Sequence, residues 1–373
     1  LPGDANKAAT QLSDQLAELD CQLLYSISCE GAIAPLQAQL YYDRYSHYKI
    51  PRIRGTFLLH QLRLKLGNQV FAKLMNTVHD RFKEKPMSYR DFIAVADSVR
   101  VGEHSLEPFI LQWLERAELP RPTISAETVK ADDGWDVSLR VKQPESNAYH
   151  FITTLAIDTG KEKKWRKIEV TQPDQVFTFH MQGKPSALFF NVGNDIPVPR
   201  KNYYTLSNFY DDFDHTLIVY GTARQVEANH TMALQYQTVL ADRFSEILPP
   251  LRKDSEISSS ELETSDLFVL GGVEDNRIMK SLAEKLGLVM GKNFFQWQGK
   301  VYADAADGLM AAYPNPYNPN RTVYFVISNS ALQLYQMTKQ VQRPPRVPGW
   351  GVFKGDQVIA QGYHPVEDYE IIF

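Results

Sequence analysis

Hydrophobic residues recur at helical spacing through the first 120 or so residues of the chain. Leucines lie three and four residues apart near the start, and pairs such as Leu58 and Leu62 continue the spacing. Repeats of this kind are typical of amphipathic helices. Pro120 and Pro122 then interrupt the pattern, because proline cannot continue a helix. We therefore expect a helical region over 1–122.

From Thr123 onward the hydrophobic period changes to two. Val137, Leu139 and Val141 alternate with polar residues, and several later runs do the same up to about residue 200. Turns that contain glycine separate these runs. Short alternating runs joined by turns are typical of antiparallel sheets. The pattern predicts an antiparallel β-sandwich over 123–210.

Continuous apolar runs follow at 216–220, 266–270 and 322–327. Each ends in glycine or small polar residues and is followed by a helical pattern, so the order repeats three times. A repeated order of strand, turn and helix is typical of a parallel sheet covered by helices. We expect a three-layer α/β domain, Rossmann- or flavodoxin-like, over 211–373. The whole chain is then a multi-domain protein of mixed α and β structure.

Composition narrows the classes of protein. The chain has 373 residues and a net charge of −4, so no general basic field attracts nucleic acid. No apolar run approaches the roughly 18 residues of a membrane-spanning helix. The two cysteines, Cys21 and Cys29, exclude a disulfide-rich scaffold. Either they close one small disulfide loop or they are thiols, and an exported protein, secreted or periplasmic, is compatible with both.

Several catalytic motifs are absent from the sequence. It contains no H-E-x-x-H zinc motif, no G-x-S-x-G elbow and no G-x-x-x-x-G-K-[ST] phosphate loop. No G-x-G-x-x-G follows a predicted strand and opens a helix. We therefore expect neither a metal site nor a self-contained catalytic site in this chain.

A candidate ligand site follows from the expected α/β topology. In open parallel sheets, ligands bind beyond the carboxyl ends of the strands. Asn229 is expected to open the helix after the first strand, where free N–H groups can receive an anion. Glycine and asparagine are also ordinary turn residues, which is the alternative interpretation. The candidate ligand-binding residues are Gly221, Thr222, Asn229, Gly271, Gly272 and Asn329.

A set of spaced residues in the helical region carries a second signal. In order, they are Arg54-Gly55, the run TFLLHQLRLKLG, Asp91-Phe92, Phe109, Gln112, Trp113 and Leu119-Pro120. Their order and spacing over roughly 55–120 resemble the carboxy-terminal helical half of the catalytic domain of M1-family zinc aminopeptidases. A β-sandwich follows this half in such enzymes, which agrees with the alternating region from residue 123.

The resemblance implies that the zinc ligands and the glutamate base lie upstream, outside this sequence. Zinc is then a cofactor of the parent enzyme only, and this chain alone is inactive. The family's transition-state tyrosine corresponds in position to Arg52, and Arg54 stands for the motif lysine. Tyr48 and Tyr45 are nearby alternative donors. The parent is therefore an enzyme with a displaced tyrosine, an enzyme that uses Arg52, or a relative without activity.

These observations lead to two hypotheses of function. In the first, the chain is the non-catalytic carboxy-terminal region of an M1-like metallopeptidase, meets peptide substrates through the parent, and completes the peptide cleft while adding accessory domains. In the alternative, it is a catalytically inactive binding or interaction protein whose α/β domain binds a small ligand or partner. The sequence leaves the oligomeric state open. Under either hypothesis, Gly55 is expected to allow another helix to pack closely, and Gly67 is expected to end a helix.

Overall fold

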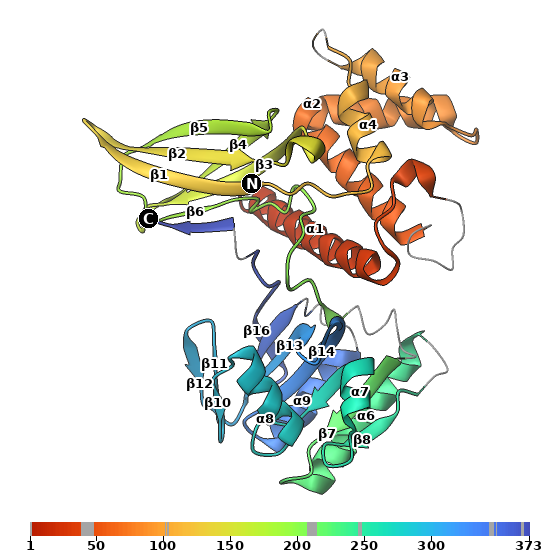
Figure 1. Cartoon of the computed structure of the whole chain (residues 1–373), viewed down its shortest axis with the longest axis vertical. Coiled ribbons are helices and arrows are strands. Elements are labelled where there is room, and N and C mark those ends of the chain that lie inside the picture. Colours follow the sequence, from red (N-terminus) through yellow and green to blue (C-terminus); the bar gives the residue numbers. More distant parts are fainter. Residues whose placement is uncertain are drawn as a thin grey trace. The chain divides into compact units, whose positions relative to one another are not determined.

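The structure, a computed structural model, describes residues 2–38, 48–100, 102, 104–206, 215–244, 248–342, 347, 349–366 and 369–373. The chain forms two compact units (Figure 1). The first contains residues 1–200 and 365–373, and the second contains residues 201–364. The expected helices and antiparallel strands thus share one unit, and the division into three domains stays a prediction.

Four α-helices are described in the first unit. They are α1 (Pro2–Glu30), α2 (Ile50–Phe82), α3 (Tyr89–Val99) and α4 (Glu107–Glu115). Ser88 and Asp91 form a reciprocal capping box that fixes the start of α3. Gly67 leaves the helical conformation inside α2, with φ of 76°. The expectation for Gly55 is wrong, because a Cβ atom there would meet nothing within 4 Å.

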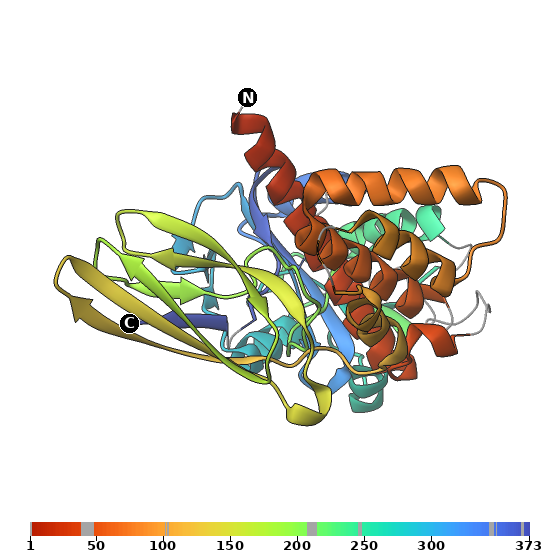
Figure 2. The same cartoon turned by 90° about the horizontal axis from the view of Figure 1, so that it is seen from above.

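Two antiparallel sheets complete the first unit. One has the strand order β1 (Thr123–Ala131), β2 (Gly134–Lys142), β5 (Asp174–Met181). The other has the order β17 (Glu370–Ile372), β6 (Ala187–Phe189), β3 (Phe151–Asp158), β4 (Lys163–Val170). In both views the β1–β2 hairpin points away from α2–α4 (Figures 1 and 2).

Buried polar side chains connect the helices of this unit to its sheets. Arg54 of α2 is 1% exposed, and its guanidinium donates to the carbonyl oxygens of Ala117 and Glu118 and to the Tyr149 hydroxyl. Gln61 lies about two turns further along α2, on the same face, and pairs with both backbone groups of Ile152. Buried polar groups need such partners, so the helix and the sheet determine each other's position.

The second unit contains a seven-stranded mixed sheet, which corrects the expected all-parallel sheet. Its order is β16 (Gln357–Gly362), β15 (Trp350–Lys354), β13 (Asp307–Asn315), β14 (Asn318–Ser328), β9 (Asp266–Leu270), β7 (Thr216–Tyr220), β8 (Leu251–Lys253). Strands β14, β9, β7 and β8 are parallel, whereas β13, β15 and β16 add antiparallel pairs. Strand β13 was not predicted from the sequence, because its glycine and alanines have low strand propensity.

Helices and a small sheet cover the two faces of this mixed sheet. On one face, α8 (Arg277–Leu286) and a sheet of β10 (Met290–Gly291), β11 (Phe294–Trp297) and β12 (Lys300–Tyr302) pack on alternate residues such as Val269 and Phe325. On the other, Tyr236 of α6 (Val226–Phe244) packs on Phe268, which stacks on Tyr324. A short α7 (Ser259–Thr264) and α9 (Ala331–Gln342) complete the unit.

The two cysteines are free thiols in the structure. Both lie in the continuous helix α1, Cys21 buried and Cys29 exposed. Eight residues along a helix correspond to about 12 Å, which exceeds the reach of a disulfide. The loop-closing alternative is therefore not the one found.

Candidate functional site

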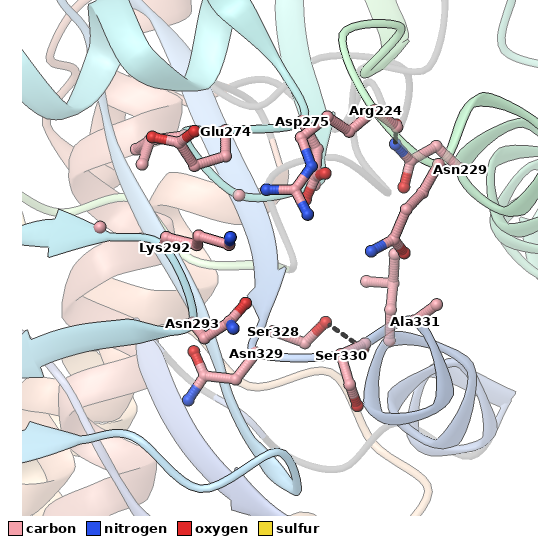
Figure 3. A pocket seen from close by; sticks show the side chains of 16 residues that line it. Arg224, Asn229, Glu274, Asp275, Lys292, Asn293, Ser328, Asn329, Ser330 and Ala331 are labelled. Carbon is pink, nitrogen blue, oxygen red and sulfur yellow. Dashed lines mark hydrogen bonds between the residues drawn. The ribbon is translucent and has the colours of Figure 1, made fainter.

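A pocket opens at the carboxyl ends of the parallel strands β9 and β14 in the second unit. Its empty space is about 480 Å³, a volume that includes open solvent at the mouth. Four of the six candidate ligand-binding residues line it, namely Asn229, Gly271, Gly272 and Asn329. Figure 3 shows the lining side chains converging from several loops and from the start of α9. The topology therefore brings most of the predicted site together, and ligand binding there stays a prediction.

The turn after β9 forms one wall of the pocket. Gly271 has φ of +101°, a conformation that suits glycine, and its N–H donates to the carbonyl oxygen of Val326 in β14. The carbonyl oxygen of Gly272 accepts from the N–H groups of Asp275 and Asn276. The buried Asn276 side chain then caps α8 by accepting from Ile278 and Met279. The N–H groups of Ile278 and Met279 at the start of α8 thus have an acceptor within this chain.

Asn229 lies one turn inside α6 and does not open it. The helix begins at Val226, so the Asn229 N–H is already bonded to the carbonyl oxygen of Gln225. The expectation that this N–H receives an anion is therefore wrong. The side chain is 3% exposed, and its Nδ2 donates to the carbonyl oxygens of Gly221 and Arg224. The amide holds the loop between β7 and α6 in place.

The opposite wall is the turn between β14 and α9. Asn329 donates through Nδ2 to the carbonyl oxygens of Tyr302 and Asp304, which fixes this turn to the loop before β13. The Ser330 hydroxyl accepts from the N–H of Gln333, as an N-terminal capping residue does. The start of α9 is therefore held at the edge of the pocket.

Charged residues of the pocket include several that the sequence did not single out. Arg224 comes from the β7–α6 loop, Lys292 from the turn between β10 and β11, and Glu274 and Asp275 from the turn after β9. Burial raises the pKa of the Asp275 carboxyl, and the nearby Arg224 guanidinium opposes that shift. Arg224 follows Gly221 by only three residues in the sequence, so its place after a predicted strand could have identified it as a pocket residue. Lys292 had none, because the small sheet that positions it was not predicted.

Gly221 and Thr222 do not line the pocket. A Cβ atom on Gly221 would lie 2.3 Å from the carbonyl oxygen of Asp275, so this glycine permits close backbone packing. Thr222 bonds through its N–H and its hydroxyl to the buried carboxylate of Asp254. Asp254 also accepts from the N–H of Arg277 at the start of α8. Both residues therefore have structural contacts that connect β7 with its neighbours.

The candidate catalytic residues of the first unit lie at the start of α2. Tyr48 is 43% exposed, and Arg52 is also exposed. The Arg52 guanidinium lies 5.5 Å from the centre of the Tyr48 ring. The two side chains therefore meet on the surface of the helix, where solvent or a partner can reach them. Tyr45 lies outside the described residues.

Metal and membrane features were searched over the described part of the chain. It contains no group of three or more histidine, cysteine, aspartate or glutamate side chains that could hold a metal ion. A zinc ion of the kind that the family resemblance implies therefore does not fit the described residues. None of the described helices has the length and apolar character needed to cross a membrane.

Comparisons with known proteins assign neither a family nor a function to this chain. No family model matches the chain, and no curated protein matches it. Among solved structures, one similar chain is aminopeptidase A of Legionella pneumophila in complex with aspartic acid. The TM-score is 0.33 at 11% identity, covering 52% of this chain and 21% of that one. This chain thus spans about a fifth of that protein, and a likeness so weak assigns neither fold nor function.

Proposed function

We propose that this chain is the non-catalytic carboxy-terminal region of a larger M1-like metallopeptidase. In this proposal, the helices of the first unit complete one wall of a peptide cleft, and the second unit is an accessory domain. The zinc and the general base belong to the rest of the parent. This chain alone binds no catalytic zinc and hydrolyses no aminoacyl substrate.

The observation that supports the proposal is how the spaced motif residues are used. Arg54 and Trp113 are buried, and Gln112 pairs with both backbone groups of His150 just before β3. The Trp113 ring also packs on Tyr149, with centroids 5.1 Å apart. Residues that join the helices to the following sheets need a fixed order and spacing. The spacing of the motif residues is therefore required by this arrangement of helices and sheets, and a protein with the same arrangement needs the same spacing.

Arg52 and Tyr48 are the residues of this chain that could act on a peptide in the parent. A phenol or a guanidinium can donate a hydrogen bond to the tetrahedral oxyanion formed when a peptide is hydrolysed. Both side chains are exposed at the start of α2, and neither is used in the core. The alternatives remain a tyrosine donor, an arginine donor, and a parent without activity.

The experiment starts from the protein purified from its natural source. We expect an intact mass well above 42.6 kDa, about one zinc per molecule, and zinc-dependent release of amino-terminal residues. A species of 42.6 kDa without zinc would contradict the proposal and favour the binding-protein alternative. Zinc-dependent hydrolysis by this chain alone would also contradict it.

Matched variants in the purified parent then assign the donor. Tyr48→Phe and Arg52→Gln are compared with Tyr89→Phe and Arg90→Gln, because Arg90 likewise lies over the Tyr89 ring at 5.7 Å. Loss of an oxyanion donor should lower kcat by about 100- to 1,000-fold. We expect such a loss in one of the first two variants only. Equal activity in all four would show that the region contributes no donor.

A further inference from the structure

We propose that the pocket of the second unit binds the oxyanion group, a phosphate or a carboxylate, of a small ligand. Every residue involved belongs to the second unit, and the proposal is independent of the peptidase function. It rests on four features of the pocket. They are a helix start whose first N–H groups have no partner among the described residues, two convergent cations, a glycine that neither the turn nor the packing requires, and a buried acceptor without a described donor.

The first feature is the start of α9. Within the described chain, the N–H groups of Ala331 and Leu332 have no hydrogen-bond partner, whereas that of Gln333 is capped by Ser330. The first N–H groups of a helix lack partners inside it, and the helix dipole adds partial positive charge there. Ser328 and Ser330 are bonded to each other beside these donors (Figure 3). An oxyanion at this point receives backbone donors.

The second feature is a pair of cations from two other elements. Arg224 and Lys292 line the pocket, and neither side chain forms a hydrogen bond or an ion pair within 4 Å with any described residue, although the Arg224 guanidinium acts electrostatically on the nearby Asp275 carboxylate. Figure 3 shows both head groups pointing into the middle of the pocket, with Asp275 beside Arg224 and the Glu274 carboxylate at the margin. A guanidinium binds two oxygens of a phosphate or carboxylate, and an ammonium adds a point charge.

The third feature is Gly272. No positive φ requires a glycine there, and a Cβ atom would meet only a carboxylate oxygen of Asp275, at 3.8 Å. Gly271, by contrast, has positive φ, and Gly221 faces backbone at 2.3 Å. Neither the turn nor the packing therefore explains Gly272. Its missing side chain leaves this wall of the pocket open for a ligand to approach the backbone.

The fourth feature identifies what lies next to the oxyanion. Asn229 uses only its Nδ2, so its Oδ1 accepts no hydrogen bond from the described residues. The Oδ1 of Asp275 is buried and also lacks a donor within the described chain. Both residues line the pocket. Of these two acceptors, only the Asp275 Oδ1 is both buried and without a described donor. A buried acceptor needs a donor, so the ligand that fits best carries a hydroxyl or amino group beside its oxyanion.

The test measures anion binding to the full chain by isothermal titration at constant ionic strength. The probes are inorganic phosphate, acetate and glycerol 3-phosphate, which adds hydroxyl donors to a phosphate. We expect saturable binding at millimolar concentrations, with glycerol 3-phosphate tighter than inorganic phosphate. Binding of acetate but not of the two phosphates would identify the carboxylate as the oxyanion. No saturable binding of any probe would overturn the proposal.

Variants place the binding in this pocket. Arg224→Gln and Lys292→Gln should each weaken binding about tenfold, since each removes one charge-assisted contact. Gly272→Ala should weaken it, because the added Cβ atom narrows the pocket at the wall formed by the turn after β9. The control is Lys280→Gln, an exposed lysine of α8 that does not line the pocket. Unfolding temperatures establish that each variant is folded. Equal affinity in the double variant Arg224→Gln, Lys292→Gln and in the control would overturn the proposal.

Discussion

Replacing Gln61 by leucine should loosen the contact between α2 and β3 in the first unit. Gln61 is 0% exposed, and its amide makes three hydrogen bonds of 2.8 Å, to the carbonyl oxygens of Ile152 and Asp195 and from the Ile152 N–H. Leucine has a similar volume but cannot form any of them. Three backbone groups would then be buried without partners.

The expected loss follows from those three groups. A buried group left without its partner costs about 1–3 kcal/mol, so three cost about 3–6 kcal/mol, taking the lower half of that range. The added apolar side chain offsets up to about 2 kcal/mol. With that full offset, we expect the free energy of unfolding of the first unit to fall by about 1–4 kcal/mol. The matched control is Gln69→Leu, an exposed glutamine of α2, with a change within about 0.5 kcal/mol.

The assay is amide hydrogen exchange of the full chain, read by mass spectrometry on peptides from β3 and, for comparison, from β14. It suits a protein of two units, for which a single unfolding transition need not hold. In Gln61→Leu, exchange should accelerate in β3 and stay unchanged in β14. If β3 exchanges alike in Gln61→Leu and Gln69→Leu, the glutamine amide does not hold the helix to the sheet.

The remaining predictions concern the second unit. Gly221→Ala should lower its stability by about 1–3 kcal/mol, because the added Cβ would clash with the Asp275 carbonyl oxygen 2.3 Å away. An unchanged unfolding temperature would show that the β7 turn moves freely. Hydrogen bonds from the Ser258 backbone and the Arg252 side chain lower the pKa of Glu261 below its ordinary value of 4.5. The stability that this carboxylate contributes is therefore present above pH 4.5 and is lost as the pH falls through the lowered pKa. Glu261→Gln should flatten that acid limb in urea titrations of the second unit, and an identical limb in both proteins would contradict the assignment.

The elements that the sequence revealed are those with strong local patterns. The runs 216–220 and 266–270 are strands whose residues are all buried, so an unbroken apolar run was enough to find them. Strand β13 is just as buried in its first six residues, but Gly308, Ala311 and Ala312 give it no strand-like composition. Its place is set by pairing with β14 and β15, which local propensity does not encode.

The candidate site was predictable to the extent that topology alone fixes it. Strand ends identified Gly271 and Asn329, because both follow strands that the apolar runs disclosed. Lys292 reaches the pocket from the turn of a small sheet, a tertiary arrangement with no local signal. Gln61 and Gln112 were likewise invisible as core residues, since their partners at Ile152 and His150 are far away in sequence.

The strand β17 has a consequence for how the protein forms as it is synthesised. Ile371 pairs with Leu188, the Phe190 N–H bonds to the Tyr369 carbonyl oxygen, and the two rings lie 5.0 Å apart. The second unit lies between these partners in the chain. Until β17 leaves the ribosome, β6 has an open edge that can pair with a neighbouring nascent chain. A polypeptide that stops at residue 364 would keep that edge open, so chaperones that bind exposed strand edges should act on this chain until β17 has been synthesised.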